Sequence, residues 1–144
     1  VIPAFLFAGM VWRAVCLETD RNQQRDMAPV QSLHRAIGTV IGRQQQRVTI
    51  SRRVATTMFD MWNLQHWLLE RRPRLVPKTL AHKRFRAAYD FLMLRISAGE
   101  ATAEIGTWWT RIQEVDGPTR RKMITELTVP QKRGRRRHRR GKTA

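Results

Sequence analysis

The sequence predicts an all-α protein of about five to six helices, and two observations support this class. Apolar residues recur at intervals of three and four in successive segments, which are separated by Gly, Pro and polar residues. No segment shows the alternation of apolar and polar residues that is typical of a half-buried strand. We therefore expect a helical body in residues 1–129 and a basic tail in residues 130–144.

The first predicted helix begins at Pro3, where the missing N–H of proline removes no helical hydrogen bond, and runs to about Leu17. Residues 5–12 are apolar on nearly every side of this helix, which predicts burial on several faces. The apolar run is too short to span a bilayer, and it lacks the basic leader and cleavage pattern of a signal peptide. Because the chain begins inside this run, we expect the helix to complete a domain that lies upstream.

The second predicted helix follows a polar stretch, residues 18–26, which we expect to form a loop. Helical spacing marks its apolar face at Val30, Leu33, Ile37, Val40 and Ile41. Gly38 and Gly42 either weaken this helix or permit close packing against it.

The third predicted helix is capped by Ser51 and extends to about Glu70. Its apolar positions are Val54, Met58, Met61, Trp62, Leu68 and Leu69. Pro73 and Pro77 are expected to terminate it, because proline removes a backbone donor and clashes with the preceding turn.

Three more helices complete the predicted body. The fourth runs from about Ala81 to Gly99, the fifth ends before Gly117 and Pro118, and the sixth covers residues 119–127. Their apolar positions are Phe85, Ala88, Tyr89, Leu92 and Ile96; then Ile105, Trp108, Trp109, Ile112 and Val115; then Met123, Ile124 and Leu127.

The tail predicts a polyanionic partner. Residues 130–144 hold eight cations and no carboxylate: Lys132, Arg133, Arg135, Arg136, Arg137, Arg139, Arg140 and Lys142. Such a segment is expected to be disordered when free. Six of the eight are arginines, whose planar guanidinium groups suit phosphates and bases, so nucleic acid is favoured over a membrane. The alternatives are a solubilising tail or a nuclear-import signal.

The body is also basic. Of 28 Lys and Arg residues, the tail contains eight, which leaves 20 against all 11 carboxylates. The cations gather at predicted helix ends: Arg52 and Arg53; Arg71, Arg72, Arg74 and Lys78; Lys83, Arg84 and Arg86; Arg120, Arg121 and Lys122. Such clusters can grip a phosphate backbone, while any single cation can also be an ordinary solvated charge.

Aromatic residues are further candidates for contact with bases. Trp62, Tyr89 and Trp108 lie in apolar stripes and are expected in the core. Trp67 and Trp109 are the better candidates for stacking on bases.

The sequence shows no convincing catalytic or metal-binding pattern. Glu18 and Asp20 lack an adjoining glycine-rich turn, and His66 and Glu70 lack further ligands. Cys16 is the only cysteine, so no internal disulfide can form, and a reducing, cytosolic setting fits. We predict no catalytic residue, no metal site and no cofactor in this chain.

Several segments resemble one known family. Residues 2–12 (IPAFLFAGMVW), 57–65 (TMFDMWNLQ) and 85–95 (FRAAYDFLMLR), the Trp108-Trp109 pair and the arginine-rich end resemble, in the same order, the C-terminal region of the bacterial poly(A) polymerase I family, polynucleotide adenylyltransferases related to tRNA nucleotidyltransferases. Ser51 stands where that family usually has proline, and residues 18–48 match poorly.

The resemblance implies a parent enzyme that adds AMP from ATP to RNA 3′ ends in the bacterial cytoplasm and so promotes RNA decay. ATP and Mg²⁺ would serve its N-terminal nucleotidyltransferase head, which has no counterpart in this sequence. This chain would hold single-stranded RNA, first through the cations of the tail and second through Lys83, Arg84 and Arg86. It would also contact RNA-decay factors, and would be inactive alone. The alternatives are a structural or protein-interaction module with a solubilising tail, and a basic DNA-binding helical protein, which lacks a clear helix-turn-helix signal.

Overall fold

The computed structural model describes residues 3–128, and these residues form seven helices and no strand. The helices are α1 (Pro3–Gln23), α2 (Pro29–Gln45), α3 (Arg52–Glu70), α4 (Val76–Ala81), α5 (Phe85–Ser97), α6 (Ala103–Glu114) and α7 (Gly117–Glu126). The predicted all-α class is confirmed for this part of the chain. None of these helices is long and apolar enough to cross a membrane.

Helix α1 continues six residues beyond Leu17, so the predicted loop over residues 18–26 is wrong for most of its length. The polar residues of these extra turns have partners on α2. Nδ2 of the buried Asn22 donates a hydrogen bond to the carbonyl oxygen of Ser32 at 3.1 Å. The Glu18 carboxylate accepts one from Arg43 at 3.1 Å. The polar composition therefore reflects contacts between helices rather than a loop.

Helix α3 begins and ends as predicted, although the physical cause of its end differs from the one we expected. Oγ of Ser51 accepts a hydrogen bond from the backbone N–H of Val54 at 3.3 Å, which confirms the cap. At the other end Arg71 adopts a left-handed conformation with φ of 47°, and its N–H donates to the carbonyl oxygen of Trp67. This residue terminates the helix before either proline is reached.

The prediction missed helix α4 altogether. Pro77 lies in its first turn, where a proline is compatible with helical geometry because no helical bond needs its N–H. The expected terminator of one helix thus starts another. Ala81, where we expected the next helix to start, is the last residue of α4, and helix α5 starts at Phe85.

The last two helices follow the prediction closely. Helix α6 ends before Gly117 as expected. Helix α7 begins two residues earlier than predicted, at Gly117, because Asp116 caps it by accepting a hydrogen bond from the N–H of Thr119 at 2.9 Å.

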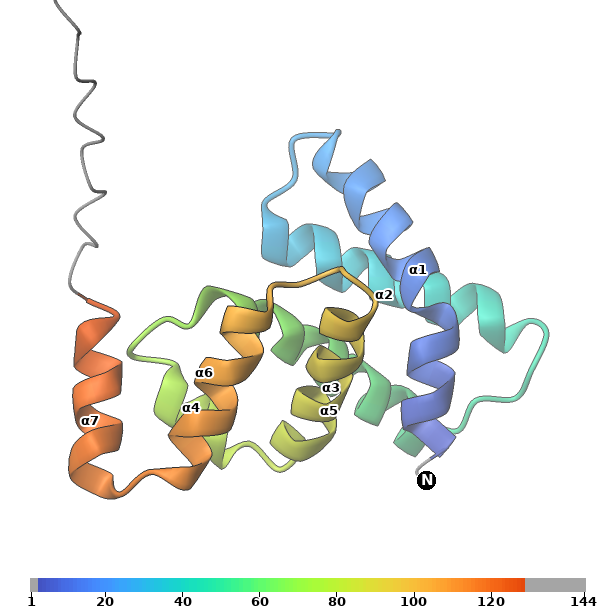
Figure 1. The fold of residues 1–144 in the computed structure, drawn as a ribbon. Coiled ribbons are helices and arrows are strands. Elements are labelled where there is room, and N and C mark those ends of the chain that lie inside the picture. The colour runs from blue at the N-terminus through green and yellow to red at the C-terminus, as the bar shows by residue number, and fades with distance from the viewer. Residues whose placement is uncertain (1–2, 129–144) are drawn as a thin grey trace, which may run out of the picture.

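Two apolar clusters share helices α3 and α5. The first cluster lies among α1, α2, the first half of α3 and α5. The second cluster lies among the second half of α3, α4, α5, α6 and α7. Met58 and Trp62 of α3 belong to the first cluster, whereas Leu64 and Leu68 belong to the second. In Figure 1 these shared helices accordingly stand between the α1–α2 pair and the α4, α6 and α7 group.

Only part of α1 is buried by the described residues. Ala8 and Val15 are fully buried, but Leu6 is 57% exposed, Met10 79% and Leu17 51%. Within residues 3–128 no other helix covers the stripe Leu6, Met10 and Leu17. Burial of this face by an upstream domain, as the sequence led us to expect, stays a prediction.

Candidate nucleic-acid interface

The turn between α3 and α4 concentrates positive charge at one end of the molecule. The left-handed Arg71 reverses the chain, and the N–H of Leu75 donates to the carbonyl oxygen of Arg72 at 2.8 Å. Arg71, Arg72 and Arg74 are consequently held on one short turn, which we call the basic corner. A rigid turn of this kind can present donors to a phosphate backbone without a large loss of chain entropy.

The three arginines of the basic corner differ in availability. Arg71 pairs with Glu104 at 3.4 Å, and its guanidinium carbon lies 5.7 Å from the centroid of the Trp108 ring. Arg72 pairs with Glu70. Arg74 is exposed and forms no ion pair within residues 3–128, so it is the one most free to meet an external anion.

The basic corner adjoins the end of the described chain. Arg72, Pro73, Arg74, Leu75 and Thr128 line a hollow of about 490 Å³. The following sequence contains the eight cations predicted as the first RNA contacts, Lys132, Arg133, Arg135, Arg136, Arg137, Arg139, Arg140 and Lys142, and these lie outside the described residues. These cations therefore follow in the sequence after Thr128, which lies beside Arg72 and Arg74.

The second predicted cluster, Lys83, Arg84 and Arg86, contains three unlike side chains. Lys83 is exposed and has no ion pair in the described part of the chain. Arg84 is half-buried, and its Nε is enclosed without a hydrogen-bond partner among residues 3–128. Arg86 is exposed, but its Nε lies 3.3 Å from Asp90 and its guanidinium covers the Tyr89 ring at 5.6 Å. Of the three, Lys83 is the one that is both exposed and without an ion pair among residues 3–128, and the RNA contacts themselves stay a prediction.

The cations of α7 also divide between structural and exposed positions. Nε of Arg120 donates to the carbonyl oxygen of Ile112 at 3.1 Å, which ties α7 to α6. Arg121 and Lys122 are exposed. Hydrogen bonding by the side chain and the backbone N–H of Thr119, aided by Arg121, lowers the pKa of the Asp116 carboxyl and keeps this cap charged.

The tryptophans correct the prediction about base stacking. Trp109, a predicted stacking candidate, is fully buried, and its Nε1 donates to the carbonyl oxygen of Leu68 at 2.8 Å. Trp108, predicted as a core residue, is half-buried beneath Arg71. Trp67 is half-buried as well, while Trp62 is confirmed in the core. Trp109 is therefore excluded as a surface stacking residue.

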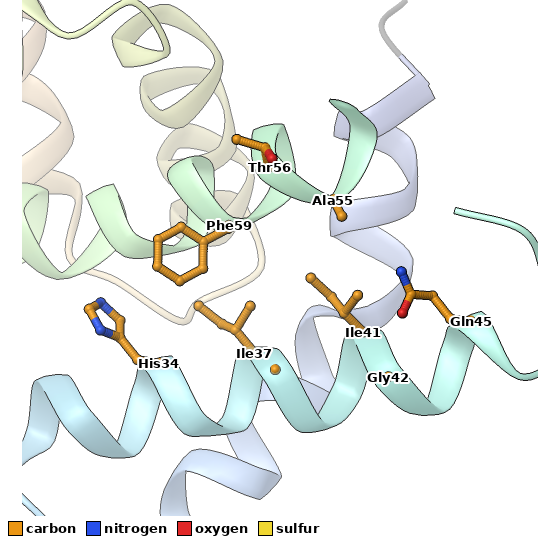
Figure 2. A pocket seen from close by; sticks show the side chains of 9 residues that line it. His34, Ile37, Ile41, Gly42, Gln45, Ala55, Thr56 and Phe59 are labelled. Carbon is orange, nitrogen blue, oxygen red and sulfur yellow. The ribbon is translucent and has the colours of Figure 1, made fainter. Parts of the chain in front are cut away.

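A groove between α2 and α3 was not anticipated from the sequence. It has a volume of about 340 Å³, and Figure 2 shows side chains of both helices along it. Its lining residues are His34, Ile37, Gly38, Ile41, Gly42, Gln45, Ala55, Thr56 and Phe59. A Cβ built at Gly38 or Gly42 would meet nothing within 4 Å, so close packing does not explain these glycines. Because residues four apart lie on the same face of a helix, the spacing of these two glycines was the signal in the sequence that could have revealed the groove.

The remaining polar candidates form local pairs. His66 and Glu70 lie 3.2 Å apart on α3. No group of three or more His, Cys, Asp or Glu side chains capable of holding a metal occurs among residues 3–128. Burial raises the pKa of the Cys16 thiol to about 11, which keeps it protonated at neutral pH.

The sequence of this chain is similar to those of known proteins. A family described as "Polymerase A arginine-rich C-terminus" matches residues 25–143. Poly(A) polymerase I of Escherichia coli O6:H1 is 34% identical over 132 residues, which cover 88% of this chain and 28% of that protein. The enzyme of the same name from Salmonella typhi is 32% identical over 131 residues, with the same coverage. That of Haemophilus influenzae is 31% identical over 127 residues, covering 86% of this chain and 28% of its own length.

Proposed function

The chain belongs to the polymerase A arginine-rich C-terminus family, and from this premise we propose that it is the RNA-holding region of a bacterial poly(A) polymerase. The chain spans 28% of the length of the poly(A) polymerases that it matches. In our proposal, the remainder of such an enzyme contains the nucleotidyltransferase head, which would bind ATP and Mg²⁺ and transfer AMP to RNA 3′ ends. The residues of this chain bind the RNA and direct its 3′ end toward that head.

The observation that carries the proposal is the position of Thr128 beside Arg72 and Arg74. The eight cations of residues 130–144 follow in sequence from a basic corner on the helical body, so both can act on one phosphate backbone. Contacts of this kind position RNA and supply affinity without reading its sequence. We propose single-stranded RNA as the partner, RNA-decay factors as further partners, and the bacterial cytoplasm as the location.

Electrostatic binding makes a quantitative prediction about salt. If the chain neutralises roughly seven phosphates of a single strand, the affinity falls about a thousandfold between about 50 and 200 mM salt, at a slope of about −0.7 per phosphate. We would measure this with a fluorescent single-stranded RNA, using the whole chain and a variant that lacks residues 130–144. The proposal requires tight, steeply salt-dependent binding that weakens and flattens on deletion. Absence of binding by the whole chain at low salt would refute it.

One observation favours a second candidate function, that of a structural module. The exposed stripe Leu6, Met10 and Leu17 is suited to packing against another part of a polymerase. In that case the basic groups would serve solubility or protein partners. Unchanged RNA affinity after deletion of residues 130–144 combined with charge reversal at Lys83, Arg84 and Arg86 would favour this alternative.

A further inference from the structure

We propose that the groove between α2 and α3 binds one unstacked nucleotide of a single-stranded RNA. This inference rests on the proposed function and adds a site that accepts a base, at the opposite end of α3 from the basic corner. The volume of about 340 Å³ lies within the range of small-ligand sites, which is roughly 300–1,000 Å³. Figure 2 shows Ile37, Ile41 and Phe59 pointing into the space between the two helices.

The aromatic end of the groove offers a surface for stacking. The His34 and Phe59 rings lie 5.2 Å apart at 46°, one from each helix. Nε2 of His34 donates a hydrogen bond to Oδ1 of Asn63 at 2.8 Å, which orients the imidazole. Since every base has an apolar face, such a platform accepts bases with little sequence preference.

The glycines keep the groove open at a cost to α2. Gly38 and Gly42 are exposed, and neither would meet another atom within 4 Å if it carried a Cβ. Glycine inside a helix destabilises it relative to alanine, and here no close contact among the described residues compensates for that. An external occupant of the groove would account for both glycines.

Charge favours an RNA nucleotide over an apolar protein segment. Arg52 lies three and four residues before Ala55 and Thr56, so it shares the face of α3 that lines the groove. Arg52 is exposed, and none of the residues that line the groove is a carboxylate. An apolar floor with a cation at one end suits a base joined to a phosphate.

The glycines allow a direct test by filling the groove. Gly42→Leu should block the space without displacing any packed atom, while Gly42→Ala adds only a methyl group and controls for the change in helix propensity. Thr107→Leu is the matched control for an added leucine, because Thr107 is exposed and borders a different hollow between α5 and α6. The probe is a fluorescent oligoadenylate, titrated at several salt concentrations, with circular dichroism to verify that each variant is folded.

We expect Gly42→Leu to weaken binding about tenfold, as the loss of one stacked base does, with an unchanged salt slope. Gly42→Ala and Thr107→Leu should stay within about twofold of the original chain. Photocrosslinking of an oligonucleotide that carries 4-thiouridine should label peptides from residues 34–45 or 55–59. Equal affinity of Gly42→Leu and the original chain, or crosslinks elsewhere only, would overturn the inference while leaving the proposed function intact. Failure of the original chain to bind RNA would refute the proposed function itself.

Discussion

Nε1 of Trp12 donates a hydrogen bond to Oε2 of Glu100 at 2.8 Å, although 88 positions separate these residues in the chain. The same carboxylate oxygen accepts a bond from Nε of Arg95 at 3.3 Å. The guanidinium of Arg95 in turn lies 4.8 Å from the centroid of the Trp12 ring. These three side chains connect α1 to α5 and to the turn before α6, and so link the first apolar cluster to the helices of the second.

Replacement of Glu100 should therefore lower the stability of the whole chain. Glu100→Ala leaves the nearly buried Trp12 N–H without its acceptor and the Arg95 guanidinium without its carboxylate, so we expect a loss of about 1–2 kcal/mol in the free energy of unfolding. Glu104→Ala is the control, since Glu104 is 78% exposed and its pair with Arg71 should contribute less than about 1 kcal/mol. Urea denaturation measures both, and equal losses would contradict the role of Glu100.

Free and paired cations should contribute differently to RNA binding. Arg74→Ala and Lys83→Ala each remove an exposed cation that has no ion pair within residues 3–128, and each should reduce the salt slope by about 0.7 if it contacts one phosphate. Arg86→Ala removes the same charge, but Arg86 is held by Asp90 and Tyr89 and should leave the slope unchanged. A salt series with single-stranded RNA distinguishes the variants. An equal effect of Arg86→Ala would show that net charge alone matters.

The Cys16 thiol should be unreactive in the folded chain. Burial raises its pKa from 9.0 to about 11, even though the nearby Arg95 acts in the opposite direction. This rise in pKa reduces the fraction of thiolate at pH 8 by roughly a hundredfold, and the thiolate is the reactive form. We expect alkylation at least that much slower in native buffer than in concentrated urea, with a native rate that still rises above pH 9. A native rate that levels off near pH 9 would show an ordinary pKa and hindered access only.

Two glycines provide a matched test of helix packing. A Cβ at Gly42 has open space, so Gly42→Ala should increase stability by about 0.5–1 kcal/mol through helix propensity. A Cβ at the buried Gly106 would lie 2.6 Å from Cδ1 of Ile96, so Gly106→Ala must displace that side chain and should lower stability by about 1 kcal/mol. Thermal unfolding should thus shift in opposite directions. A shift of the same sign would show that the α5–α6 contact adapts freely.

Local signals in the sequence account for most of the secondary structure. The cap at Ser51 and the spacing of apolar residues predicted the start of α3 and its end near Glu70, and they predicted α6 and α7 closely. Helix α4 was missed because six residues are too few to show a periodic apolar face. The end of α1 was misplaced because partners of Glu18 and Asn22 lie on α2, which local sequence does not reveal.

The candidate interface was predictable as charge but not as geometry. Composition identified the cations, but it could not distinguish Lys83, Arg84 and Arg86 from one another. In the structure Arg86 forms an ion pair with Asp90, whereas Nε of Arg84 is buried. Trp108 and Trp109 are adjacent apolar residues on one helix, so periodicity alone could not decide which of them is buried. The packing of α6 against α3 places Trp109 inside, where Leu68 accepts its N–H.

The sequence by itself determined the all-α class, the approximate extent of six helices and the excess of positive charge. These properties depend on side-chain type and on spacing over a single turn of helix. Only the tertiary structure decided which cations are free, which tryptophan is buried, and that Arg72 and Arg74 border Thr128. Those outcomes depend on contacts between residues far apart in the chain, such as Trp12 and Glu100, and the helical period carries no information about which faces will meet.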